Sequence, residues 1–426
     1  MAVSTRERVA HVIRRLSMGP HPNVVGGIDD VDAALDRALD LTTPPAPLLD
    51  FPAPADFQSA RMLTEIGPPI AWWFDRMASP DRMVEERLVW FWHDHFATSL
   101  AKVRAPYLMW RQHVTLRQYA TGNFADLLKA VAKDPAMVIY LDGITNTALE
   151  HNENFGRECL ELFTMGRDGG YTQDDVVAAS RSFTGWVVDV PGRVATRLGE
   201  PWQAVFVPRR HDGGVKTLLG VTGSFDMDSA LDVVLDHPST AKFVSTKLYR
   251  ELVGLDPAPA TVDRLAKAFG RDYEIMPLVE AIARDHSFVS DDAVHAKFRT
   301  PVEKVVAILQ ATGTAAGDLA SGRGVRPAGR GVATALRTMS YLPFVPPNVG
   351  GFPKGARLLG PHNLVHTFDL LQVVGPPPVA GEPVDRLFER FGLYDVSARS
   401  RSVVEDAHDA GTRFALVATS PEFTLT

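Results

Sequence analysis

The sequence contains a single cysteine, Cys159, among 426 residues. A disulfide within the chain and a metal site built from several cysteines are therefore excluded. No apolar run approaches the roughly 18 residues that a membrane-spanning helix needs. The first 19 residues interrupt their apolar positions with Arg and Glu, and they contain no apolar core of signal-peptide length. From these absences we expect a cytoplasmic protein with no membrane partner.

The chain also lacks an excess of basic residues. It has 44 Lys and Arg against 51 Asp and Glu, which gives a net charge of −7. Nucleic acids and anionic membranes select basic surfaces, so we expect no nucleic-acid partner. Hydrophobic residues make up 45% and charged residues 22% of the chain, which are ordinary values for a folded globular protein with a sizeable core.

The strong short motifs of common enzymes are absent as well. The sequence has no phosphate-binding loop of the Walker type, no GxGxxG after a predicted strand and no HExxH pair of zinc ligands. It also has no GxSxG nucleophile elbow. Candidate functional residues must therefore be found among other clusters of polar residues.

Helical periodicity dominates the first 185 residues, and it returns after about residue 227. Between these parts, 185–190 and 193–198 flank a Pro-Gly turn and predict a β-hairpin, to which 203–207 adds a strand. The predicted fold is mainly α, a multi-helix globular fold with a small β-hairpin insertion near 185–220. We divide the chain into an N-terminal helical part (1–185), the insertion (186–220) and a C-terminal helical part (221–426).

The first polar cluster is Trp92-His93-Asp94-His95-Phe96. Residues two apart on a helix point about 200° apart, so His93 and His95 would face one ligand only in a strand or at a broken helix end. Neutral imidazole is a common metal ligand, which makes each histidine a candidate. The alternative is a buried histidine held by a hydrogen bond among core aromatic residues.

The second cluster lies in a predicted helix over 146–165. Asn154, Glu158 and Glu161 share one face of this helix, and Arg157 lies one turn from both Glu153 and Glu161. Two carboxylates one turn apart can bind a cation, divide acid and base roles, or hold an arginine for a substrate. The alternative is a ladder of surface ion pairs, from Glu153 through Arg157 to Glu161, which contributes little stability.

Two further clusters add candidates for substrate binding. Tyr171 and Trp186 offer flat walls for a sugar or an aromatic ligand, although aromatic core packing is the simpler interpretation. His211 and Asp212 lie in a basic segment whose Asp-Gly pair favours a tight hairpin turn. That segment either binds an anion or forms a solvated turn.

A Pro- and Gly-rich segment over 343–355 follows the predicted helices of the C-terminal part. It contains too many Pro and Gly residues for a regular element. It includes Asn348 and Phe352, and it either borders a pocket or covers the core. Upstream, Pro301 suits the first turn of a helix, and Arg299 precedes it.

Taken together, these segments resemble a bacterial family called domain of unknown function 1800. The resemblance rests on the run Asn152-Glu-Asn-Phe-Gly-Arg-Glu158 through Leu162, on Gly170-Tyr-Thr172, and on Thr184-Gly-Trp186. It extends to 92–96, 134–135, 211–213, 240–248 and Pro301, and so covers nearly the whole chain. The resemblance implies the location of a site and no reaction.

The chain departs from the family pattern at two positions. Gly156 stands where the family usually has Ala, which predicts a helix loosened by up to about 1 kcal/mol. Asp94 stands where the family often has Asn, and it adds a negative charge between two histidines. Many relatives resemble exported proteins, which this chain does not.

Three functional hypotheses follow. The first is a hydrolase for a polar, carbohydrate-like substrate, with Glu158 and Glu161 as acid and base beside His95, and with substrate contacts from Asn154, Arg157, Tyr171, Trp186, His211 and Asp212. The second is an enzyme with one divalent metal ion bound by His93, His95 and Glu158. The third is a non-catalytic binding or scaffold protein, in which the polar helix fixes helix packing.

Overall fold

The computed structural model describes residues 3–56, 65–191, 201–317, 332–374 and 381–426. Its helices up to the first strand are α1 (Thr5–Leu16), α2 (Pro22–Gly26), α3 (Val31–Leu39), α5 (Gly67–Ala78), α6 (Met83–His95), α7 (Leu100–Val103), α8 (Pro106–Tyr119), α9 (Phe124–Ala132), α10 (Pro135–Tyr140), η1 (Gly143–Thr145), α11 (Asn154–Glu158), the π-helical segment η2 (Cys159–Thr164) and α12 (Gln173–Ser182).

The β region follows, and helices then run to the end of the chain. These elements are β1 (Trp186–Val188), β2 (Ala204–Phe206), η3 (Pro208–Arg210), β3 (Lys216–Leu218), β4 (Val221–Gly223), α13 (Met227–Asp236), α14 (Pro238–Val253), α15 (Pro259–Asp272), α16 (Ile275–Ala283), α17 (Pro301–Thr312), α19 (Val332–Thr338), η4 (Gly355–Leu359), α20 (Pro361–Val374), α21 (Val384–Arg390), α22 (Ala398–Glu405), α23 (Ala410–Val417) and α24 (Pro421–Thr424).

The predicted fold class is confirmed. Helices dominate the described residues, and the sheets found there are two antiparallel pairs, β1 with β2 and β3 with β4. Local signals set many helix ends. Thr172 and Asp175 form a capping box at the start of α12, and Thr300 and Glu303 form another at the start of α17. None of the described helices has the length and apolar character needed to cross a membrane.

The structure tests the predicted strand pairing only in part. β1 pairs with β2, with Trp186 opposite Phe206, and the predicted partner 193–198 lies outside the described residues. The tight hairpin turn is not at Asp212-Gly213. It lies between β3 and β4 at Leu219 and Gly220, which both have positive φ, as such a turn requires.

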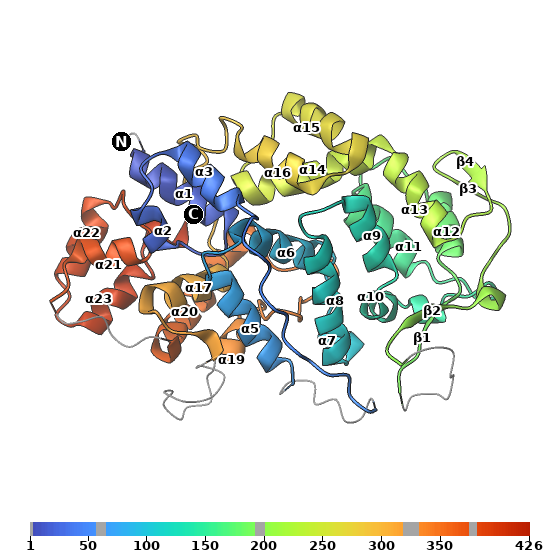
Figure 1. The fold of residues 1–426 in the computed structure, drawn as a ribbon, viewed down its shortest axis with the longest axis horizontal. Coiled ribbons are helices and arrows are strands. Elements are labelled where there is room, and N and C mark those ends of the chain that lie inside the picture. Colours follow the sequence, from blue (N-terminus) through green and yellow to red (C-terminus); the bar gives the residue numbers. More distant parts are fainter. Residues whose placement is uncertain (1–2, 57–64, 192–200, 318–331, 375–380) are drawn as a thin grey trace.

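The helices form an elongated molecule in which distant parts of the sequence lie side by side (Figure 1). Helices α21 to α23 occupy one end beside α1 and α2, the β-hairpins occupy the other end, and α6 runs through the middle. Contacts join the N-terminal helix to the C-terminal part, because Arg14 of α1 donates to the carbonyl oxygen of Gly392 and Glu7 of α1 accepts from the backbone N–H of Tyr394. The three predicted parts contribute to one hydrophobic core. Whether they behave as separate domains stays a prediction.

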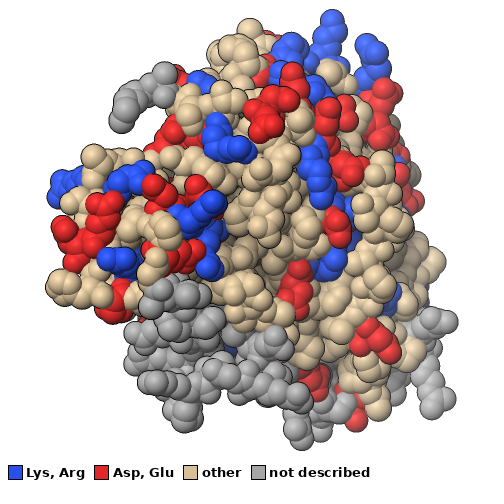
Figure 2. Space-filling view, turned by 60° about the vertical axis from the view of Figure 1, so that its left-hand side comes forward, with Lys and Arg blue, Asp and Glu red and all other residues tan. Residues whose placement is uncertain are grey.

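The surface carries charges of both signs. In Figure 2, Lys and Arg side chains lie beside Asp and Glu side chains over the visible face, with an uncharged band between charged areas. This face therefore presents mixed polarity, in keeping with the small negative net charge of the chain.

Candidate functional site

The site is built around the C-terminal half of α6, which is buried on nearly all sides. His93 and His95 point to different partners, as expected for residues two apart on a helix. The Nε2 atom of His93 accepts a hydrogen bond from the backbone N–H of Phe344 at 3.1 Å, and Nε2 of His95 lies 2.9 Å from the carbonyl oxygen of Phe163. Burial lowers the pKa of His93 to about 4 and that of His95 well below its ordinary value. Both imidazoles are therefore neutral at pH 7.

The predicted metal-binding set does not come together. Nε2 of His93 is already hydrogen-bonded to the backbone N–H of Phe344, and Nε2 of His95 is hydrogen-bonded to the carbonyl oxygen of Phe163. Among the residues that the structure describes, no group of three or more His, Cys, Asp or Glu side chains could hold a metal ion. The two histidines instead match the alternative interpretation, since both are buried among aromatic rings such as Trp73, Phe96 and Phe163.

Asp94, between the two histidines, binds the Pro- and Gly-rich segment 343–355 to α6. Its Oδ1 accepts a hydrogen bond from the backbone N–H of Phe352 at 2.7 Å, and its Oδ2 lies 2.6 Å from Nζ of Lys354. Gly351 has φ +92°, and a Cβ atom there would lie 2.2 Å from Oδ1 of Asp94. Only glycine allows the segment to approach α6 this closely.

A cavity of about 560 Å³ opens where this segment meets α6 and α14. We call it the central cavity. Its aromatic lining residues are Trp90, Phe91, Phe243, Phe298, Tyr341 and Phe352. Its charged lining residues are Asp94, Lys247, Arg250, Glu251, Asp256, Lys297 and Lys354. The segment 343–355 therefore borders a pocket, which was one of the two predicted alternatives. The volume is typical of a site for a small molecule.

Stacked rings form one wall of the central cavity. The ring of Phe352 lies 5.1 Å from that of Trp90 and 5.0 Å from that of Tyr341, and both pairs are nearly parallel. The hydroxyl of Tyr341 donates to the carbonyl oxygen of Pro353 at 2.5 Å. Such a wall is rigid and apolar, and a ligand with a flat or hydrocarbon face could pack on it.

Lys247 of α14 is the lysine of this wall that has no carboxylate partner among the described residues. Its Nζ lies 3.5 Å from the carbonyl oxygen of Leu162, at the outer limit of a hydrogen bond, and 5.2 Å from the centre of the Phe243 ring. The pKa of Lys247 is lowered to about 7. Burial is the largest cause, the ammonium of Lys354 acts in the same direction, and the carboxylate of Asp94 opposes both. The side-chain amine of Lys247 is therefore neutral in a large share of the molecules at physiological pH.

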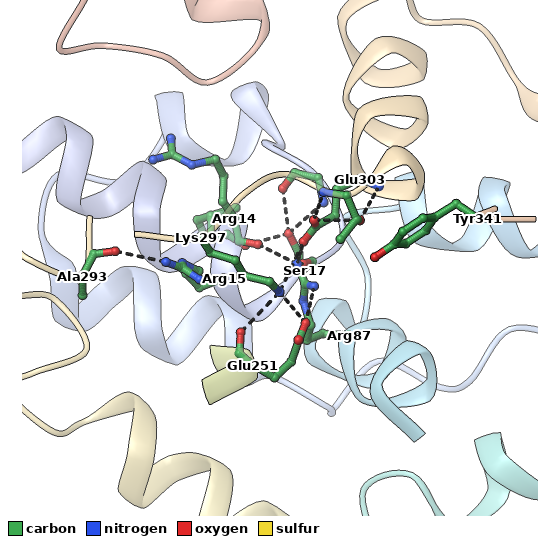
Figure 3. Close-up of polar contacts among 12 residues, drawn as sticks. Arg14, Arg15, Ser17, Arg87, Glu251, Ala293, Lys297, Glu303 and Tyr341 are labelled. Atoms are coloured by element: carbon green, nitrogen blue, oxygen red, sulfur yellow. Dashed lines mark hydrogen bonds and ion pairs between the residues drawn. The ribbon is translucent and has the colours of Figure 1, made fainter. Parts of the chain in front are cut away.

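The other side of the cavity rests on a buried network of charges (Figure 3). Lys297 pairs with Glu251, and Arg87 bridges Glu251 at 3.1 Å and Glu303 at 2.7 Å. Arg87 also donates to the carbonyl oxygen of Ser17. Burial by itself would raise the pKa of Glu303, but Lys297 and Arg87 outweigh it and hold that pKa well below its ordinary range. Lys297 and Glu251 thus face the cavity as a fixed ion pair.

The predicted acid–base pair lies outside this cavity lining, on the flank formed by α11 and η2. Glu158 has no hydrogen bond or ion pair with any described residue, and burial raises its pKa, followed by the charge of Glu161. Glu161 pairs with Arg167 at 2.6 Å. Burial and then the charge of Glu161 raise the pKa of Tyr171.

The alternative ladder of ion pairs forms only in part on this flank. Arg157 pairs with Glu153 at 2.8 Å and with Gln173, but Glu161 pairs with Arg167, so the described pairs do not run continuously from Glu153 to Glu161. Asn154 donates to Asp142 at 3.0 Å. The side chains of Arg157 and Glu153 are each 40% exposed, so their pair resembles a surface ion pair.

Trp186, His211 and Asp212 gather at a third place, the base of the β1–β2 pair. Nδ1 of His211 lies 3.1 Å from Oγ1 of Thr184, and the ring of Trp186 packs on Phe206. Asp212 pairs with Arg181 at 2.6 Å, and this hydrogen bond lowers its pKa to about 2. Asp212 also lies 3.2 Å from Nε2 of His151, which precedes α11.

The segment 92–96 does contact the helix that carries Glu158 and Glu161. The contact is between His95 and Phe163, which follows Glu161 closely in the sequence. Sequence reasoning missed Lys247, Lys297, Glu251 and Tyr341 as lining residues of the cavity. The one available signal was the presence of Lys247 in a segment that carries the family resemblance. Burial and the lack of a carboxylate partner, which distinguish this lysine, are properties of the folded chain.

Fold and site together define a helical protein with an aromatic and charged central cavity. A family model described as protein of unknown function (DUF1800) matches residues 11–425, and the chain belongs to this family. No curated protein and no solved structure matches the chain.

Proposed function

We propose that the chain is an enzyme that acts on a small polar substrate in the central cavity, with Lys247 as the reacting group. The observation that carries this proposal is that Lys247 lines a cavity of small-molecule size without a described carboxylate partner. A neutral amine can accept a proton or attack an electrophilic carbon, whereas an ammonium can do neither. The pKa of about 7 supplies that neutral form.

The other lining residues support binding of a polar molecule. The stacked wall of Trp90, Phe352 and Tyr341 can hold an apolar face of the substrate. Lys354 and the Lys297–Glu251 pair supply fixed charges of both signs for polar groups. A substrate that combines a compact carbon skeleton with polar groups, such as a sugar derivative or a small acid, fits this arrangement.

A ligand screen tests the proposal. Sugars, sugar acids, keto acids and amino acids would be tested for a rise in melting temperature of the wild-type chain, and each hit would then be assayed for turnover by mass spectrometry. We expect stabilising ligands to lose their effect in Lys247→Met and in Leu255→Trp, which narrows the cavity. Lys242→Met is the matched control, because Lys242 lies on the same helix with a 53% exposed side chain.

Hits that stabilise Lys247→Met and Leu255→Trp as much as wild type would contradict a site in this cavity. Circular dichroism of both variants checks that they are folded before the comparison. Hits that bind in the cavity without turnover would support a binding protein instead of an enzyme.

Glu158 and Glu161 support a second candidate, a hydrolase that works on the α11–η2 flank. The specific observation is that the two carboxyl groups have different surroundings: Glu158 has a raised pKa and no described partner, and Glu161 is paired with Arg167. Two carboxyl groups whose surroundings push their pKa values apart are a common acid–base arrangement. Chromogenic glycosides and esters would test it, with loss of roughly 10²–10⁴-fold in Glu158→Gln and no loss in the control Glu153→Gln.

A further inference from the structure

Among the described residues, three lysines line the central cavity, and two of them are paired with carboxylates. Lys354 pairs with Asp94, and Lys297 pairs with Glu251. The amine of Lys247 has instead the long contact to the carbonyl oxygen of Leu162 and the face of Phe243. Its lone pair is therefore available to a ligand in the cavity once the proton has left.

We infer that the substrate carries an aldehyde or ketone group and that Lys247 forms an imine with it, which rests on the proposed function. The nitrogen of Lys247 attacks the carbonyl carbon and forms the new C–N bond, and a proton passes from nitrogen to oxygen. The hydroxyl of this carbinolamine then takes up a proton from solvent, and the carbon–oxygen bond breaks as the nitrogen lone pair forms the C=N bond. One water molecule leaves, and the resulting iminium returns a proton to solvent to give the imine. The step needs no oxidant or reductant.

The surroundings of Lys247 favour this chemistry over simple ion binding. An amine that is desolvated beside a second cation is the recognised environment of lysines that react with carbonyl groups. Phe243 and Phe91 give the lining an apolar character. Asp94 is the acidic group whose charge acts on Lys247, and the same charge stabilises the positive iminium nitrogen.

Reductive trapping tests the inference. The full-length protein would be incubated at pH 7 with glycolaldehyde or pyruvate and sodium cyanoborohydride, which reduces iminium ions faster than free carbonyl groups. Intact mass and peptide mapping would locate the adduct. We expect one adduct per chain on Lys247, formed at least about ten-fold faster than on any exposed lysine, because exposed amines are almost fully protonated at this pH.

Two variants make the outcome decisive. Lys247→Met should remove the fast adduct, and Lys242→Met should keep it. Trapping spread over exposed lysines at equal rates, or an unchanged fast adduct in Lys247→Met, would overturn the inference. A further outcome separates the two proposals. If screened ligands bind the wild type and not Lys247→Met, but no carbonyl probe is trapped on Lys247, the inference of an imine is wrong and the proposed function stands. A dependence of the trapping rate on pH with a midpoint near 7 in wild type supports the imine even if Lys247→Met is unstable.

Discussion

Nε2 of His95 lies 2.9 Å from the carbonyl oxygen of Phe163, and this contact joins the two motifs that carry most of the polar residues. A carbonyl oxygen only accepts, so Nε2 carries the proton. Phe163 lies in the last turn of η2, where helix carbonyl groups lack partners within the helix. The contact thus satisfies a helix end and fixes His95, and the neighbouring carbonyl of Leu162 lies near Lys247.

Arg87 and Arg157 should differ strongly in their contribution to stability. Arg87 is 1% exposed and holds two carboxylates, so Arg87→Met leaves buried charges without their partner and should cost about 3–5 kcal/mol of unfolding free energy. Arg157→Met breaks a pair whose two side chains are 40% exposed and should cost less than about 1 kcal/mol. Urea denaturation followed by circular dichroism measures both. Equal losses would contradict the assignment of Arg157 to the surface.

Gly156 should resist substitution by the alanine that the family usually has there. A Cβ atom at this position would lie 2.2 Å from Oγ and 2.8 Å from the backbone nitrogen of Ser180. Glycine therefore permits α11 and α12 to pack closely, and Gly156→Ala should destabilise the fold by about 1–3 kcal/mol despite its better helix propensity. The double variant with Ser180→Ala removes the hydroxyl contact but not the backbone one, so it should recover only part of the loss. A stabilising Gly156→Ala would show that propensity outweighs packing here.

The chain should lose stability as the pH falls from about 6.5 toward 4. Burial lowers the pKa of His93 to about 4 and of His21 to about 3, and it lowers those of His11, His95 and His113 well below 6.5. In this range the unfolded chain binds more protons than the folded chain, so acidification favours unfolding, by about 1.4 kcal/mol per histidine and pH unit. Asp134 and Glu158 have the opposite sign, because burial raises the pKa of Asp134 to about 7 and also raises that of Glu158, but these are two groups against five histidines.

His113 offers a direct check of this explanation. Neither of its ring nitrogens has a partner among the described residues, and it packs between Trp73 and Trp110. His113→Phe should therefore keep the fold and reduce the pH dependence by about 1.4 kcal/mol per pH unit below 6.5. Urea denaturation at pH 7.5, 6 and 5 measures the slope for both proteins. An identical slope in the variant would mean that other groups control acid unfolding.

Asp94→Asn should change the reactivity of Lys247 more than it changes the fold. The asparagine oxygen can still accept from Phe352, so the stability should change by less than about 1 kcal/mol. The lost negative charge no longer opposes the lowering of the Lys247 pKa, and Lys354 loses its partner. The midpoint of the pH dependence of amine labelling at Lys247 should therefore move to lower pH. A shift to higher pH would contradict the proximity of these charges.

The sequence by itself determined most of the helices and the fold class. Helical periodicity after about residue 227 is followed by α14, which has Pro238 at its first turn and ends before Gly254, and both signals act within a few residues. The cap at Thr172 is a local signal of the same kind. Pairing of β1 was only partly predicted, because short strands select a partner through contacts that are distant in sequence.

Tertiary structure alone decided which polar residues share a site. The central cavity takes its walls from 90–94, 243–256, 296–300 and 341–358, and no periodicity connects segments so far apart. Asp94 and the Pro- and Gly-rich segment were recognised as unusual, but their contact required the fold. Lys247 has the same chemistry as Lys242 in the sequence. Burial without a described carboxylate partner gives Lys247 its lowered pKa, and burial is set by packing of the whole chain.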